Sequence, residues 1–145
     1  MKIKTKEINR KIKVKSTTDN LSRIRDFIHK TGMECKLKKE AIGEIILAVD
    51  EACTNVIKHA YHFSPEGEIE INVKCKNNKF SVSITDKGEK FNIKDIKDPD
   101  LEEYHKEKRV GGLGIFLMKK LMDEVKYSHL TGNRNRVTLV KYLPN

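Results

Sequence analysis

The sequence is poor in cysteine, and its few cysteines lack the pattern of a metal site. Cys35, Cys53 and Cys75 show no CxxC spacing and no paired histidines, so we do not expect a zinc site. An odd, sparse set of cysteines is typical of reduced thiols in a cytosol. We therefore expect these three side chains to be free.

Long apolar runs are missing as well. The longest apolar stretches fall far short of the roughly 18 residues that a membrane-spanning helix needs. The first residues lack the apolar segment of a signal peptide. Internal repeats and low-complexity linkers are also absent. These absences, together with the length, predict a single cytoplasmic domain over residues 1–145 that does not contact membranes.

Acidic residues are outnumbered by basic ones. The chain has 30 Lys and Arg against 21 Asp and Glu, a formal charge of +9. This excess suggests an anionic partner but does not choose among nucleic acid, nucleotide, acidic protein and membrane surface. Residues 1–15 alternate Lys with apolar residues, which suits a solvated strand face or a binding patch. A nucleic-acid-binding domain is an alternative from another class, but these residues contain no aromatic side chains. We therefore expect no direct nucleic-acid contact.

The order of the expected elements indicates the fold class. Apolar alternation, helical spacing and turn residues predict strands near 8–15, 69–75, 80–84, 124–130 and 135–143, and helices over about 21–32, 37–61 and 112–123. Gly32 is expected to end the first helix, and KNNK is expected to turn between two strands. Strands run consecutively instead of alternating with helices. This order predicts an α+β two-layer sandwich with a mostly antiparallel sheet and helices on one face.

The long helix has an apolar face and a polar back. Ile42, Ile45, Ile46, Val49, Cys53, Val56, Ile57 and Ala60 follow helical spacing without a gap. Glu51 falls on the opposite side, with Asn55 one turn further on and small alanines along the flank. Because Asn is a poor helix former, Asn55 in mid-helix needs a reason. The pair suits a metal-bound ligand, and a solvated helix back is the alternative. His59 and His62 are expected to be structural or capping residues.

The strand near 80–84 runs into Asp86, then Gly88. An Asp that follows a buried strand sits at the edge of a cavity, and its acceptor-only carboxylate suits an exocyclic amine such as that of adenine. Gly88 would allow a tight turn and the approach of a flat ring. A plain turn explains the D-x-G pattern equally well.

Three glycines precede the last helix. Gly111, Gly112 and Gly114 would let an anion reach the unpaired amides at the start of a helix, which is phosphate-binding chemistry. The pattern is neither G-x-G-x-x-G after a strand nor a glycine-rich loop with G-K-[ST], so a Rossmann or P-loop site is disfavoured. A flexible hinge is the alternative.

Together, these segments resemble the ATP-binding domain shared by gyrase, MutL, heat-shock chaperones and histidine kinases. DEACTNVIKHAY resembles its N-box, DKGEKF its first glycine box and GGLGIFLMKKLMDEV its second. The form EA-TN-I-HAY, the short length and D-x-G-x-x-F resemble one branch, the anti-sigma-factor serine kinases of bacteria.

The resemblance implies roles for matching residues. Glu51 matches the general base, Asn55 the Mg²⁺ ligand, and Asp86, with Gly88 beside it, the residue that binds the adenine amine. The lid glycines that contact phosphate match Gly111, Gly112 and Gly114, and Thr138 matches a hydroxyl residue near the adenine. Arg109 is a weaker candidate for neutralising phosphate charge, with Lys106 and Lys108 as alternatives.

The resemblance also implies a function. A protein of this branch uses ATP and Mg²⁺, binds a sigma factor, phosphorylates an anti-anti-sigma protein on serine or threonine, and forms a homodimer. The alternative is a regulatory ATP-binding module without kinase activity, acting in another partner-switching pathway.

Overall fold

A five-stranded sheet forms one layer of the molecule. The computed structural model describes residues 7–91 and 118–143. The strands lie in the order β1-β2-β3-β5-β4, and each neighbouring pair is antiparallel. Their bounds are Ile8–Lys15 for β1, Glu68–Lys76 for β2, Lys79–Asp86 for β3, Glu124–Leu130 for β4 and Arg134–Tyr142 for β5.

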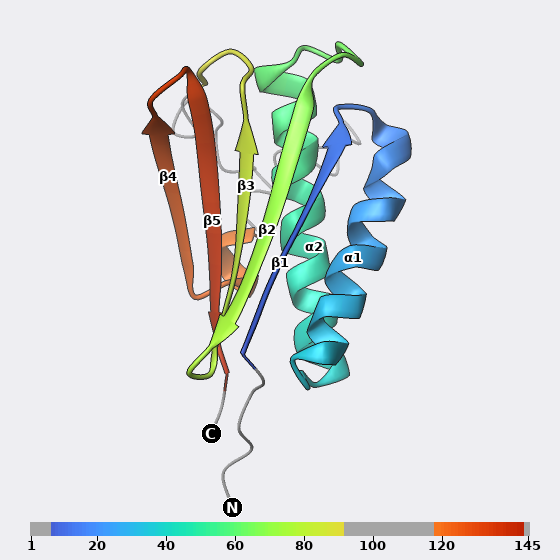
Figure 1. Ribbon diagram of the computed structural model, residues 1–145, viewed down its shortest axis with the longest axis vertical. Helices are drawn as coiled ribbons and strands as arrows, with labels where there is room; N and C mark the ends of the chain where they lie inside the picture. Colours follow the sequence, from blue (N-terminus) through green and yellow to red (C-terminus); the bar gives the residue numbers. More distant parts are fainter. Residues whose placement is uncertain (1–6, 92–117, 144–145) are drawn as a thin grey trace, which may run out of the picture.

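In the part of the chain that the structure describes, the helices α1 and α2 form the second layer. A 3-10 turn, η1 (Thr18–Asn20), leads into α1 (Leu21–Glu34), and α2 (Lys39–Asn55) continues as a π-helical turn, η2 (Val56–Ala60). Figure 1 shows α1 and α2 on the same side of the sheet. The apolar stripe predicted for the long helix is buried except at Ile46, which is partly buried. The predicted α+β sandwich with helices on one face is therefore confirmed.

Gly32 does not end the first helix, contrary to the expectation. The helix α1 continues to Glu34, and Gly32 is buried inside its last turn. A Cβ on Gly32 would lie 2.8 Å from Cγ1 of Ile42 on α2. The missing side chain thus lets the two helices pack closely, and the chain leaves the helix later, at Lys36, which has a positive φ of 64°.

The hairpin between β2 and β3 has the predicted turn. Asn77 and Asn78 connect the strands and have φ values of 54° and 59°. Asn tolerates this left-handed conformation better than most residues, and two such residues in succession suit the tight two-residue turn of a β-hairpin. The turn sets the register that pairs Asp86 with Ile69 at the other end of the hairpin.

The cysteines differ from the expectation of three free thiols. Cys35, directly after α1, is joined to Cys75 of β2 by a disulfide across a sequence separation of 40. Cys53 on α2 is free and buried. Sequence spacing could not reveal this pair, because the two cysteines meet only when α1 packs on the sheet.

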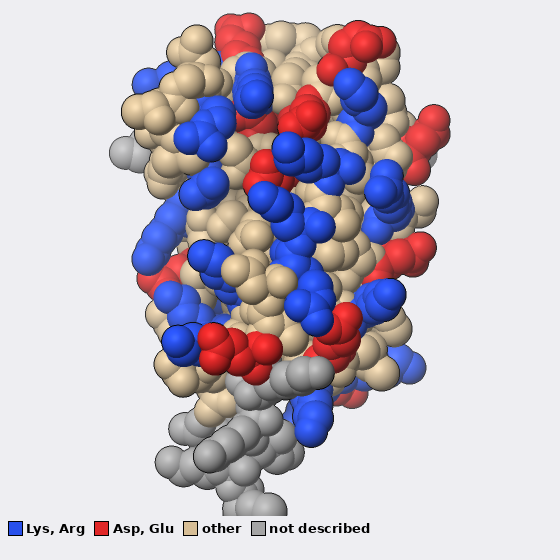
Figure 2. Space-filling view, in the orientation of Figure 1, with Lys and Arg blue, Asp and Glu red and all other residues tan. Residues whose placement is uncertain are grey.

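The sheet face opposite the helices is polar. Lys11 and Lys13 of β1 lie beside Glu70 and Glu68 of β2, with nitrogen-to-oxygen distances of 3.6 and 3.8 Å. Figure 2 shows Lys and Arg spread over this side of the molecule, with Asp and Glu between them. Such pairs are typical of the solvated strand face considered for the N-terminal lysines. Among the helices that the structure describes, none has the length and apolarity to cross a membrane.

Candidate functional site

The polar back of α2 is partly buried, and two of its side-chain atoms have no hydrogen-bond partner among the described residues. Asn55 is only 4% exposed, which excludes a solvated position for this side chain. Within residues 7–91 and 118–143, its buried Nδ2 atom has no hydrogen-bond partner, and neither has the buried Oε1 of Glu51, one turn earlier on α2. An unpaired buried polar atom costs about 1–3 kcal/mol, so a folded protein rarely keeps one without a reason. Two of them one turn apart indicate a ligand site.

Burial also changes the acidity of Glu51. Desolvation raises the pKa of this carboxyl above its usual value, and the negative charge of Asp50 adds to the effect. The positive charge of Lys58 partly opposes both. A carboxylate with a raised pKa holds a proton more readily, which suits a group that must accept one.

Asp86 ends β3 with a buried, hydrogen-bonded carboxylate. It is 3% exposed, and its Oδ1 accepts hydrogen bonds of 2.9 Å from the backbone N–H of Gly88 and from Nδ2 of Asn135. Burial raises the pKa of Asp86, while the bonds from Asn135 and Gly88 act in the opposite direction. The hydrogen bonds described for this carboxylate use Oδ1, which leaves Oδ2 for another donor.

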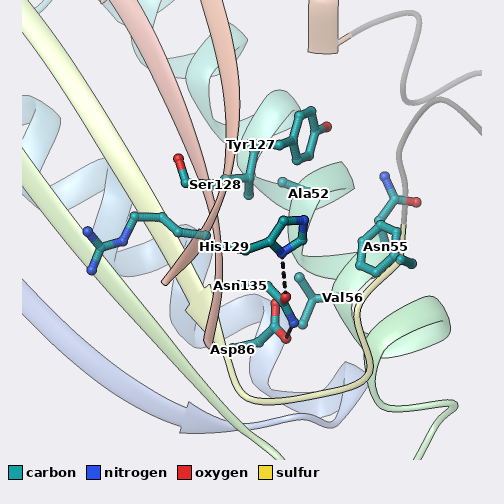
Figure 3. A pocket seen from close by; sticks show the side chains of 11 residues that line it. Ala52, Asn55, Val56, Asp86, Tyr127, Ser128, His129 and Asn135 are labelled. Carbon is teal, nitrogen blue, oxygen red and sulfur yellow. Dashed lines mark hydrogen bonds between the residues drawn. The ribbon is translucent and has the colours of Figure 1, made fainter. Parts of the chain in front are cut away.

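Asn55 and Asp86 meet in one cleft between the long helix and the sheet. The space between its lining atoms, with the open solvent at its mouth included, amounts to about 420 Å³. Figure 3 shows side chains from both layers converging on it. The lining residues are Ala52, Asn55, Val56, Asp86, Phe91, Tyr127, Ser128, His129, Asn135, Arg136 and Val137.

Sequence reasoning did not find the cleft residues on β4 and β5. Tyr127 and His129 alternate along β4, and Asn135 and Val137 alternate along β5 as their direct partners. The period of two predicts that each pair shares a face. It does not reveal that this face is the one that carries Asp86, because that depends on the pairing of β5 with β3.

Thr138 does not line this cleft, contrary to its expected place beside the adenine. Its hydroxyl lies 3.3 Å from that of Ser83, its direct partner on β3. Successive side chains of a strand point to opposite faces, so Val137 faces the cleft and Thr138 the other side of the sheet.

Several expected phosphate-binding residues cannot be placed. Arg109, Gly111, Gly112 and Gly114 lie outside the residues that the structure describes. Of the helix expected over residues 112–123, the structure describes helical residues at 118–121. This segment is tied to the core by Lys141, whose Nζ lies 2.7 Å from the carbonyl oxygen of Leu121 and 3.0 Å from Oε2 of Glu44.

His59 and His62 make structural contacts, as expected. The ring of His59 packs against that of Phe91, with centroids 5.5 Å apart. Burial lowers the pKa of His59, and the charges of Lys58 and His62 lower it further. His62 Nε2 lies 2.7 Å from Oε2 of Glu89 at the surface.

Comparison with solved structures supports the same fold. The chain superposes on the crystal structure of the RsbU and RsbW domains of a Mycobacterium tuberculosis protein with a TM-score of 0.67 and 17% identity. That match covers 94% of this chain and 32% of the other. The SiaB-SiaC complex from Pseudomonas aeruginosa gives a TM-score of 0.58 at 14% identity, covering 92% of this chain and 89% of that chain.

Sequence comparison gives nearer relatives. The chain is 37% identical over 109 residues to the serine-protein kinase RsbW of Bacillus subtilis, and 36% over 108 residues to that of Listeria monocytogenes. These matches cover 72% of this chain and 66% and 68% of the relatives. A Bacillus velezensis relative of the same name is 37% identical and is covered over 65% of its length, so the match spans slightly less than two thirds of the Bacillus proteins. The model of the histidine kinase-like ATPase domain matches residues 14–141, nearly the whole chain. The chain therefore belongs to the histidine kinase-like ATPase domain family, as its three sequence boxes predict, and within it is similar to the serine-protein kinases RsbW.

Proposed function

We propose that this chain is an ATP-dependent protein kinase that transfers a phosphoryl group to a serine or threonine hydroxyl of a partner protein. The observation that carries the proposal is the pair of unpartnered polar atoms on α2, Glu51 Oε1 and Asn55 Nδ2. Asn55 shares a cleft with the buried carboxylate of Asp86. The similarity to serine-protein kinases RsbW supports the choice of a kinase over other nucleotide-binding proteins.

Asp86 is suited to recognise the adenine. An ionised carboxylate only accepts hydrogen bonds, and the exocyclic amine of adenine donates them. Since Oδ1 is occupied by Gly88 and Asn135, Oδ2 is the atom proposed to accept from the amine. Val56 and Val137 supply apolar surface in the same cleft, as a flat base requires.

Asn55 is suited to hold a magnesium ion. Mg²⁺ prefers oxygen ligands, and the position of an amide oxygen is assigned from its partners. The Nδ2 atom of Asn55 has no described hydrogen-bond partner. A rotation of the amide that exchanges Nδ2 and Oδ1 would therefore turn the oxygen toward a cation without breaking a described hydrogen bond of Nδ2. Bound Mg²⁺ would neutralise phosphate charge, which is the chemistry that phosphoryl transfer requires.

Glu51 is proposed as the general base. It would take the proton from the attacking hydroxyl as that oxygen bonds to the γ-phosphorus and ADP leaves. Its desolvated position and raised pKa favour this proton transfer. On sequence alone, the amides near Gly111, Gly112 and Gly114 are proposed to hold phosphate oxygens, with Arg109 neutralising charge.

The proposed partners follow from the relatives and the sequence resemblance. We propose that the protein holds a sigma factor and phosphorylates an anti-anti-sigma protein, and that it does so as a homodimer. Sedimentation equilibrium of the purified chain tests the dimer: a single monomeric mass up to high micromolar concentration would exclude it.

Two neighbouring carboxylates on α2 provide a matched test of the kinase. Glu51→Gln should bind ATP as the wild type does but transfer phosphate at least about 100-fold more slowly, the usual scale for loss of a general base. Asp50→Asn, which alters a carboxylate paired with Arg25 at 2.9 Å, should slow transfer far less, because burial and not the charge of Asp50 is the main cause of the raised pKa of Glu51. Calorimetry measures binding, and transfer of γ-labelled phosphate to the candidate anti-anti-sigma partner measures the reaction.

The outcomes separate the two functions considered. Normal transfer by Glu51→Gln would refute the base assignment. ATP binding by the wild type without transfer to any candidate partner would favour the regulatory module over the kinase. Asp86→Asn should lose nucleotide affinity, whereas the exposed Asp26→Asn on α1 should keep it.

A further inference from the structure

Three polar side chains form a row across the last strands of the sheet. Asp86 on β3 is the direct partner of Asn135 on β5, and Asn135 is the direct partner of His129 on β4. Asn135 Nδ2 lies 2.9 Å from Asp86 Oδ1, and Asn135 Oδ1 lies 2.9 Å from His129 Nδ1. All three line the cleft and are drawn in Figure 3. The row therefore links the cleft carboxylate to the imidazole through one amide.

The chemistry of Asp86 determines the direction of each hydrogen bond in the row. A carboxylate and a carbonyl group only accept, and Asn135 Nδ2 lies within 2.9 Å of Asp86 Oδ1 and 3.1 Å of the Gly88 carbonyl oxygen. The amide must therefore turn its NH₂ group toward both. Its oxygen then faces His129, so Nδ1 of His129 must carry the hydrogen.

These hydrogen bonds hold the Asp86 carboxylate in one orientation. Asp86 Oδ1 takes two donors, Gly88 N–H and the Asn135 amide, and the amide is in turn held by His129. A carboxylate held at one oxygen cannot rotate freely, so its second oxygen keeps a defined direction. Figure 3 shows the other nitrogen of the His129 ring turned away from Asn135.

We infer that Asn135 and His129 are positioning residues that orient Asp86 for selection of a purine with an exocyclic amine. This inference rests on the proposed ATP binding and adds to it the residues that set base selectivity. Asn135 acts on Asp86 directly, and His129 acts through Asn135. Neither residue is among those proposed to hold the triphosphate, so their loss should reduce discrimination between bases and spare the shared phosphate contacts.

The test compares ATP with inosine triphosphate, which carries the same phosphates but an oxygen in place of the amine. Calorimetry should show that wild-type protein prefers ATP. Asn135→Ala should weaken ATP binding about tenfold or more, the usual effect of losing a hydrogen bond to a charged group. Binding of inosine triphosphate should change less than twofold, so the preference narrows. His129→Phe should do the same to a smaller degree.

Two further variants make the test specific. His129→Gln can still donate a hydrogen bond to the Asn135 oxygen and should restore most of the preference for ATP. Lys126→Ala, on the same strand but exposed, should leave both affinities unchanged. Equal weakening of ATP and inosine triphosphate in Asn135→Ala would overturn the inference, because a general structural lesion has that result. Absence of ATP binding in the wild type would instead refute the proposed function itself.

Discussion

The α-carbon of Gly88 stands directly against the carbonyl group of Ala60. A Cβ built on Gly88 would lie 2.5 Å from the Ala60 oxygen and 2.7 Å from its carbonyl carbon. The next residue, Glu89, donates its backbone N–H to the same oxygen at 2.7 Å. The segment after Asp86 is thus fastened to η2, the end of the helix that carries Glu51 and Asn55. The glycine is required for packing of the protein on itself, whether or not a base also approaches it.

Gly88→Ala should therefore destabilise the protein by about 1–3 kcal/mol, the usual cost of overpacking. Urea unfolding followed by circular dichroism measures the change. Gly43→Ala is the matched control, since Gly43 is exposed inside α2 and a Cβ there would meet nothing within 4 Å. That change should stabilise the helix by about 0.5–1 kcal/mol. Equal effects of the two substitutions would contradict the packing role of Gly88.

Tyr61→Phe tests a second contact that holds the segment after Asp86 in place. The Tyr61 hydroxyl accepts a hydrogen bond of 2.8 Å from the N–H of Lys87 and donates one of 2.6 Å to the carbonyl of Glu68. Its loss leaves two backbone groups unpaired and should lower the free energy of unfolding by about 1–3 kcal/mol. Tyr142→Phe, at an exposed position, should change it by less than about 0.5 kcal/mol. Thermal unfolding of both variants would show whether this difference exists.

Glu51→Gln should stabilise the protein at neutral pH. Burial raises the pKa of Glu51 in the folded state, so the folded protein binds more protons than the unfolded chain between the two pKa values. The free energy of unfolding therefore falls as pH rises through that window, and an uncharged Gln avoids this loss. The gain over wild type should be larger at pH 7 than at pH 3.5, measured by urea unfolding at both values.

Neutralising the neighbouring carboxylate, Asp50, should destabilise the protein, in contrast to the stabilisation expected for Glu51→Gln. Asp50 accepts hydrogen bonds of 2.9 and 3.2 Å from Arg25, a partly exposed ion pair. Asp50→Asn should therefore lower the free energy of unfolding by up to about 1 kcal/mol at pH 7. A gain in Glu51→Gln that does not depend on pH would show that desolvation of the charged form is not its cause.

The Cys35–Cys75 pair predicts that stability depends on the redox state. Closing a loop with a separation of 40 residues typically contributes about 2–4 kcal/mol, so a reducing agent should lower the free energy of unfolding by that amount. Cys35→Ala should abolish the dependence, whereas Cys53→Ala should retain it, because Cys53 is free. Mass spectrometry after alkylation would show directly whether two cysteines are protected in the oxidised protein.

Local patterns were sufficient to predict the order of the helices and strands in the part of the chain that the structure describes. The unbroken apolar spacing from Ile42 to Ala60 predicts the long helix, and the KNNK turn predicts the hairpin. Both depend on residues a few positions apart, where the periods of 3.6 and 2 are set by backbone geometry. The same spacing placed Glu51 and Asn55 one turn apart on the helix.

Features that depend on distant segments were beyond such patterns. Gly32 is a helix stop by local rules but proves to be a contact with Ile42, and Thr138 faces the wrong side of the sheet for its expected role. A shift of one residue along a strand moves a side chain from one face of the sheet to the other, and matching a sequence motif alone does not resolve such a shift.

The sequence by itself determined the α+β architecture, the apolar and polar faces of the long helix and the carboxylate that follows a buried strand, because each follows from periodicity between near neighbours. Only the tertiary structure decided that Asn135 and His129 stand in register beside Asp86, and that Cys35 meets Cys75. The physical reason is that strand pairing and layer packing join residues tens of positions apart. The contacts between such distant residues depend on how whole faces of strands and helices fit together, and no short stretch of sequence encodes that fit.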